Sequence, residues 1–231
     1  MHRGRREHAA VDAEHAALVA DAVPLLAKAL PWVGHPATRN RGTIGGSIAN
    51  ADPAAEICLV AVTLGAQIVT DDSRTVVSSA ADDFFVGPML TAIRPAACVT
   101  QIRFPVWSHG RVGVGFHEVS TRRSDFALVS AAAQAALDDA GRCVDIAGSA
   151  SAAPEIGRCD SRCLRCACQL STPPRFRWPS RPRVADLEVS DDRYVSAAYR
   201  RAAGVLLSRA LNDARDDAKR RASELLPGEA R

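Results

Sequence analysis

The chain has 231 residues, enough for one large or two small domains with a buried core. Its 29 basic and 26 acidic side chains give a formal net charge of +3. Both signs are spread along the chain, which argues against a nucleic-acid partner. No stretch approaches the ~20 apolar residues of a membrane span, and the charged N-terminus lacks the apolar core of a secretory signal. We therefore expect a cytoplasmic protein.

The chain up to about Val106 has the character of α/β structure. Residues 12–31 carry apolar side chains at helical spacing, which predicts an amphipathic helix that Pro24 either kinks or divides. A glycine-rich stretch comes next. The segment 56–72 then predicts a short helix and, after it, a strand at Ala66–Thr70.

Later segments predict mostly strands and end in one long helix. In chain order they are a strand with a polar turn at 73–85, a strand at 97–106, a strand at 113–122 and two strands within 125–151. The alanine-rich centre of the last segment would suit a helix equally well. Residues 192–223 predict a long amphipathic helix with arginine-rich and aspartate-rich faces.

The stretch Thr43–Ser47 has the composition of an anion-binding turn. Its two glycines, Gly45 and Gly46, predict a backbone that uses positive φ or lets another group approach closely. Consecutive amides in such a turn can point at one anion, and the hydroxyl groups of Thr43 and Ser47 add donors, which suits a pyrophosphate. Neither a P-loop nor the dinucleotide G-x-G-x-x-G spacing is present. A plain hairpin turn is the alternative.

The surrounding segment strengthens the first interpretation. The sequence "HPATRNRGTIGGSIANADPAAE" resembles the second flavin-binding segment of the FAD-binding medium subunits of molybdenum hydroxylases. This family includes the flavoproteins of carbon monoxide dehydrogenase and xanthine dehydrogenase. The later segments "FHEVSTRRSDFALVSAA" and "YRRAAGVLLSRAL" resemble the opening of the family's C-terminal domain and its terminal helix. The three segments occur in the family's order.

The resemblance implies an α+β protein with two domains. Residues 1–106 would be the second half of an FAD-binding domain of the vanillyl-alcohol-oxidase (PCMH) type. Residues 107–215 would be the α+β C-terminal domain of carbon monoxide dehydrogenase flavoproteins, with a tail at 216–231. The family's first glycine motif has no match upstream of Thr43, so we expect an N-terminally truncated member.

The resemblance also implies a function. In the family, FAD accepts electrons from an iron–sulfur small subunit and passes them to an acceptor, while a molybdopterin large subunit performs the substrate chemistry. We therefore expect an FAD-binding electron-transfer subunit that is not active alone and carries no catalytic residue or metal ligand. The alternative is a non-functional remnant that binds no flavin.

The residues implied to contact FAD fall into three groups. The pyrophosphate would lie on the turn, the ribityl, ribose or adenine part near its downstream flank, and the isoalloxazine edge near the opening of the C-terminal domain. The corresponding residues are Thr43, Ile44, Gly45, Gly46 and Ser47, then Asn50 and Glu56, then Asp125 and Phe126.

Residues 158–183 depart from the family. Arg, Cys, Pro, Ser and Trp dominate them, which is how a GC-rich gene reads out of frame, and we interpret them as an irregular, out-of-frame insertion. A rival interpretation is a metal site at a C-x₃-C-x₂-C-x-C cluster, formed by Cys159, Cys163, Cys166 and Cys168. A disordered loop is a further alternative. The isolated cysteines are expected to be buried; they are Cys58, Cys98 and Cys143.

Overall fold

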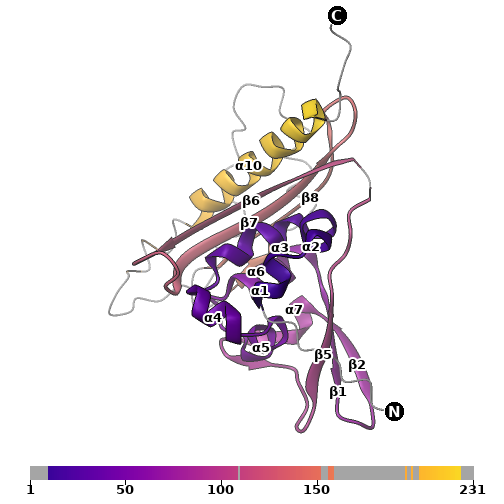
Figure 1. Ribbon diagram of the computed structural model, residues 1–231, viewed down its shortest axis with the longest axis vertical. Helices are drawn as coiled ribbons and strands as arrows, with labels where there is room; N and C mark the ends of the chain where they lie inside the picture. Colours follow the sequence, from indigo (N-terminus) through magenta and orange to yellow (C-terminus); the bar gives the residue numbers. More distant parts are fainter. Residues whose placement is uncertain are drawn as a thin grey trace, which may run out of the picture.

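The computed structural model combines a helical N-terminal part and a small sheet with a long antiparallel sheet (Figure 1). The structure describes residues 10–108, 110–151, 156–158, 196, 199 and 203–224. The last helix, α10 (Ala203–Glu224), lies along one face of the long sheet. The N-terminal helices pack against the opposite face (Figure 1). Among the described residues, no helix combines the length and the apolar character needed to cross a bilayer.

The predicted helix at 12–31 is divided into short helices. They are α1 (Ala10–Glu14), α2 (Ala17–Ala22), α3 (Pro24–Ala29) and the 3₁₀ turn η1 (Leu30–Trp32). Pro24 occupies the first helical position of α3. A proline has no N–H to contribute to a preceding helical turn, but its fixed φ suits a helix start. The prediction that Pro24 divides the helix is therefore confirmed.

The glycine-rich stretch lies within a group of three further helices, not in a turn. They are α4 (Pro36–Arg41), α5 (Ile44–Asn50) and α6 (Glu56–Leu64). All nine residues of α6 are buried, including Cys58, whose burial the sequence predicted. Helix α6 contacts α3 and α5 on one side and the long sheet on the other.

A small antiparallel sheet comes after α6, with β1 in the middle and the order β2-β1-β5. Its strands are β1 (Gln67–Asp71), β2 (Val76–Ala80) and β5 (Cys98–Arg103). Between β2 and β5 the chain forms α7 (Ala81–Phe84) and a two-stranded hairpin of β3 (Phe85–Gly87) and β4 (Leu90–Thr91). The polar turn predicted after the second strand is therefore helical. Cys98 is exposed, so its predicted burial is wrong, because it begins an outer strand on which no side chain is fully buried.

The long sheet is antiparallel throughout, in the order β6-β7-β8-β9. Its strands are β6 (Arg111–Ser120), β7 (Ala127–Leu137), β8 (Cys143–Ser151) and β9 (Ile156–Arg158). The alanine-rich segment forms strand β7, so the strand interpretation holds and the helical alternative fails. Both faces of β7 are covered, and alanine is small enough to fit on each face. Cys143 is only half-buried.

Helix α10 packs on β6 and β7 with almost no space between the backbones. A Cβ added to Gly113 or Gly115 of β6 would overlap backbone atoms of Ala210, Ala214 or Ala218 in α10. The side chains of two aspartates of α10 also form hydrogen bonds with residues of β6. The Oδ2 of Asp217 accepts from the Val114 amide at 3.1 Å, and that of Asp213 lies 2.9 Å from Nε2 of His117.

Helix α10 continues without a break through residue 216, where the sequence placed the start of a tail. Residues 159–183 and their four clustered cysteines lie outside the described residues, so the out-of-frame, metal-site and disordered-loop interpretations all remain predictions. Within the described part of the chain, no three metal-ligating side chains gather closely enough to hold a metal ion.

The close approach of α10 to β6 gives a test of the packing. We expect Gly115→Ala to lower the free energy of unfolding by at least about 2 kcal/mol, because the new methyl group meets helix backbone that cannot rotate away. Gly87→Ala is the matched control, since a Cβ there meets nothing within 4 Å. Urea unfolding measures both. Equal stability of the two variants would contradict the packing of α10 on β6.

Candidate functional site

The N-terminus of α5 is formed by the residues that the sequence predicted for the site. Thr43 caps the helix, and its Oγ1 accepts a hydrogen bond from the Gly46 amide at 2.9 Å. Threonine favours this position because its side-chain oxygen satisfies an amide that the helix cannot. Gly45 and Gly46 take helical φ values, so both the positive-φ prediction and the hairpin alternative are wrong.

The other predicted reason for a glycine at position 45 still applies, namely that another group can approach its backbone closely. A Cβ added to Gly45 would meet nothing nearer than Cγ1 of Val99, at 3.9 Å. The amides of Ile44 and Gly45 are in the first helical turn, where no preceding turn supplies an acceptor. These donors and the positive end of the helix dipole suit an anion such as a phosphate group. The residues present therefore fit a pyrophosphate.

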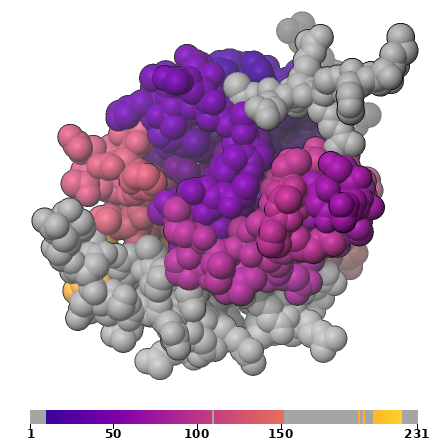
Figure 2. Space-filling view, turned by 90° about the horizontal axis from the view of Figure 1, so that it is seen from below, coloured from indigo at the N-terminus to yellow at the C-terminus, as the bar shows by residue number. Residues whose placement is uncertain are grey.

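The far end of α5 is fixed by the β3–β4 hairpin. Ala51 ends the helix in the left-handed conformation, with φ 52°, and its carbonyl oxygen accepts from the Met89 amide at 2.9 Å. Asn50 is exposed, and its Nδ2 lies 3.9 Å from Sδ of Met89. In the space-filling view the surface around α5 adjoins the later segments β4 and β5 (Figure 2). Three apolar side chains near the hairpin tip are exposed, namely Val86, Met89 and Leu90.

Glu56 lies apart from the predicted contacts in α5. It begins α6, is only 7% exposed and faces Glu118 of β6. Burial raises the pKa of Glu56 to about 7, and the charge of Asp52 adds to the shift. Burial and, after it, the charge of Glu56 raise the pKa of Glu118 to about 8. Two facing carboxyl groups cannot both ionise cheaply, so the pair retains a proton near neutral pH.

Glu118 was not predicted from the sequence. Side chains alternate between the two faces of a strand, so Glu118 lies on the same buried face of β6 as Val114 and Phe116. A carboxylate in an otherwise apolar alternating pattern was the signal that could have identified Glu118. Across the sheet it pairs with Ser130 of β7, whose buried Oγ has no hydrogen-bond partner among the described residues.

Comparison with known proteins decides what the α5 segment belongs to. Residues 8–107 match the model of a family described as the FAD binding domain in molybdopterin dehydrogenase. The FAD domain therefore contains the whole of α5 and α6, and the family resemblance found in the sequence is confirmed. FAD is the cofactor of this domain family, as the sequence also predicted.

Named relatives are similar to parts of this chain. The chain is 36% identical over 112 residues to the alpha subunit of the 6-hydroxypseudooxynicotine dehydrogenase complex from Paenarthrobacter nicotinovorans, covering 48% of this chain and 38% of that one. It is 28% identical over 194 residues to the carbon monoxide dehydrogenase medium chain of Afipia carboxidovorans, covering 81% and 65%. The chain thus spans between about a third and two thirds of the length of such relatives.

Solved structures confirm the α+β fold over nearly the whole chain. A chain of carbon monoxide dehydrogenase from Hydrogenophaga pseudoflava superposes with a TM-score of 0.78 and 25% identity, covering 90% of this chain and 72% of that one. Quinoline 2-oxidoreductase from Pseudomonas putida 86 superposes with a TM-score of 0.74 and 27% identity, covering 91% and 73%. The unit after the FAD domain therefore shares the fold of these enzymes as well.

The two site residues predicted beyond the FAD domain lie in the β6–β7 turn. The Oδ2 of Asp125 lies 3.7 Å from Nε of Arg122, which forms an ion pair at the surface. Ser124 has a φ of 68°, and Phe126 is 74% exposed on the far side of this turn. The structure brings Thr43, Gly45, Gly46 and the other α5 residues together. It places Glu56 on a buried contact and the Asp125–Phe126 pair on a separate turn.

The buried carboxyl pair predicts how stability depends on pH. Both carboxyl groups have folded pKa values above the ordinary value of 4.5, so the folded chain holds protons that the unfolded chain releases. The free energy of unfolding should therefore fall as pH rises from 5 to 8. Glu118→Gln should reduce this fall and stabilise the chain at pH 8 by about 1–3 kcal/mol, allowing for the partial exposure of Glu118.

Urea unfolding at pH 5, 6.5 and 8 measures the effect. Asp139→Asn is the control, because that carboxylate is fully exposed and its ion pair among the described residues is with Arg111 at the surface. It should leave the pH profile unchanged. A wild-type free energy of unfolding that rises towards pH 8 would contradict the buried pair.

Proposed function

We propose that the chain is the FAD-binding electron-transfer subunit of a molybdenum hydroxylase complex. The observation that carries the proposal is the capped N-terminus of α5 within an FAD domain. Free first-turn amides, an open approach to Gly45 and the helix dipole coincide there. Bound FAD supplies the reversible acceptance of electrons, and the chain supplies binding and orientation.

The described residues would divide this work among them. The amides of Ile44 and Gly45 hold the pyrophosphate, and the hydroxyl of Ser47 adds a donor in the same turn. The Thr43 hydroxyl is already used in the cap, so it orients the amides instead of binding directly. Asn50, exposed at the other end of α5, is placed for the ribityl or ribose part.

The other predicted contacts take different roles in this proposal. Glu56 is buried against Glu118, so it positions the α5–α6 connection from the protein side. The exposed ring of Phe126 and the ion-paired Asp125 lie on one turn, which suits the edge of the isoalloxazine.

We further propose that the chain works beside an iron–sulfur small subunit and a molybdopterin large subunit, from which electrons reach FAD. Relatives named as medium chains or complex subunits support this. The exposed apolar side chains of Val86, Met89 and Leu90 also suit burial in a subunit contact, because exposed apolar patches commonly mark interfaces.

A single substitution separates flavin binding from folding. Gly45→Ala adds a methyl group that the protein itself accommodates, and alanine favours a helix over glycine by about 0.5–1 kcal/mol. We expect the variant to be as stable as the wild type or more so, yet to bind FAD at least about tenfold more weakly, because the methyl group occupies the approach to the amides.

Titration of the apo chain with FAD, followed by flavin fluorescence, measures the affinity. Gly87→Ala, in the hairpin, is the control and should bind FAD like the wild type. An unchanged FAD affinity in Gly45→Ala would contradict the proposed placement. A wild-type chain that takes up no FAD would instead support the alternative of a remnant.

A further inference from the structure

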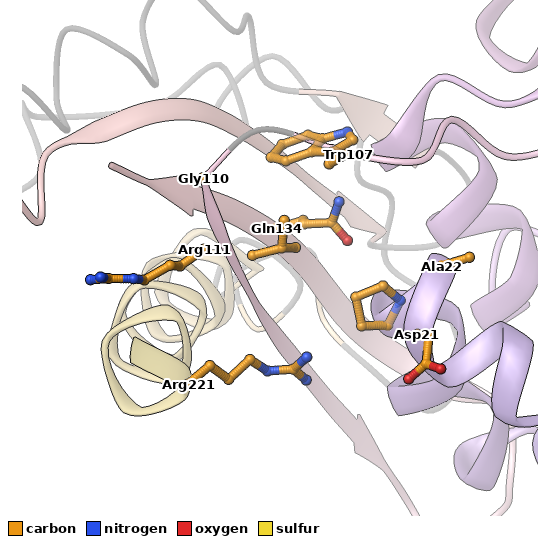
Figure 3. A pocket seen from close by; sticks show the side chains of 9 residues that line it. Asp21, Ala22, Trp107, Gly110, Arg111, Gln134 and Arg221 are labelled. Carbon is orange, nitrogen blue, oxygen red and sulfur yellow. The ribbon is translucent and has the colours of Figure 1, made fainter. Parts of the chain in front are cut away.

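A cavity lies apart from the flavin segment, at the outer edge of the long sheet beside strand β6 (Figure 3). Its volume is about 250 Å³, below the ~300–1,000 Å³ typical of pockets for drug-sized ligands. The residues that line it come from α2 and α3, the segment before β6, strands β6 and β7, and α10. They are Asp21, Ala22, Pro24, Trp107, Gly110, Arg111, Val112, Gln134 and Arg221.

Gln134 of β7 forms the deepest polar part of this cavity. Its side chain is only 2% exposed, and its Oε1 is buried with no hydrogen-bond partner among the described residues. The amide lies between Trp107 and Ala22 in the close-up (Figure 3). A buried carbonyl oxygen without a donor is costly, so the cavity favours an occupant that brings an N–H or O–H group.

Arg221 brings positive charge around the edge of the sheet. Helix α10 covers the opposite face, but the Arg221 side chain extends beside β6 towards the cavity (Figure 3). Its Nε lies 3.3 Å from Oδ2 of Asp217, the same oxygen that accepts from the Val114 amide. Within the described part of the chain, this ion pair uses Nε and leaves the two terminal nitrogens as a pair of donors for a carboxylate.

The other lining groups complete the chemistry. Arg111 adds a second positive charge, although it also pairs with the exposed Asp139. Asp21 contributes one negative charge from α2, so the charged lining residues sum to +1. The indole of Trp107 supplies a flat apolar wall against which a ring can stack (Figure 3).

We propose that this cavity binds a small flat aromatic carboxylate that also carries an N–H donor. Its carboxylate pairs with Arg221, its ring lies against Trp107, and its N–H donates to Oε1 of Gln134. None of the residues assigned to FAD lines the cavity, so this site is independent of the proposed flavin function.

Indole-2-carboxylate is the probe, because it combines a carboxylate, a ring and an N–H group. Isothermal titration of the full chain should give saturable binding with a dissociation constant of about 1 mM or tighter. Benzoate, which lacks the N–H, and indole, which lacks the carboxylate, should each bind at least about tenfold more weakly. Absence of saturable binding by indole-2-carboxylate would overturn the proposal and leave a hydrated cavity.

Two variants locate the binding. Gln134→Leu removes the unpartnered oxygen, so the unliganded chain should melt at the same or a higher temperature while the affinity for the probe falls at least about tenfold. Arg221→Gln should lower the affinity similarly. Arg220→Gln is the control, since Arg220 also pairs with Asp217 but does not line the cavity.

The pattern across the variants decides the outcome. Loss of affinity in Gln134→Leu and Arg221→Gln, with Arg220→Gln unchanged, supports the site. Equal affinity in all three variants means that the probe binds elsewhere and overturns it. FAD affinity should stay at the wild-type value in Gln134→Leu, which keeps this result distinct from failure of the flavin proposal.

Discussion

Every residue from Glu56 to Leu64 is buried, so helix α6 has protein on all sides. Each large side chain that it buries stabilises the fold by about 1.5–3 kcal/mol. Helix α6 packs against the N-terminal helix α3, against α5 and against the long sheet. The position of α6 therefore fixes how the FAD domain meets the unit after it.

The connection from α5 to α6 shows how this constraint reaches the candidate site. The Oδ1 of Asp52 accepts a hydrogen bond from the Ala54 amide at 2.9 Å, which turns the chain. The carbonyl oxygen of Pro53 accepts a hydrogen bond from Oγ of Ser151 on β8. Glu56 then meets Glu118 of β6. The chain that leaves the C-terminal end of α5 is thus tied to two strands of the long sheet, β6 and β8. This arrangement suits a group that must bind a cofactor in one fixed orientation.

The sequence predicted more of this architecture than of its contacts. Helix α6 and strand β6 were identified correctly, because α6 is a nearly continuous apolar run and the alternation in β6 reflects burial of one face. The pair Gly45–Gly46 was interpreted as a turn, because glycine weakens helices, yet the Thr43 cap and the packing on β5 outweigh that preference. The buried contact of Glu56 with Glu118 joins residues 62 positions apart, which no local pattern specifies.

The cavity beside Gln134 escaped prediction for the same reason. Its walls come from helices and strands at both ends of the chain, and only the folded sheet edge brings Trp107 and Arg221 together. Family resemblance identified the flavin segment because that signal is continuous in sequence. Sites assembled from distant segments, such as this cavity, require the three-dimensional structure.

Binding of FAD at α5 is the property on which the proposed function depends. The most direct test is the visible absorbance spectrum of the purified full chain, with the flavin released on denaturation and counted per chain. We expect a flavin spectrum and close to one FAD per chain, either as purified or after incubation with FAD. A folded, colourless chain that takes up no added FAD would contradict it.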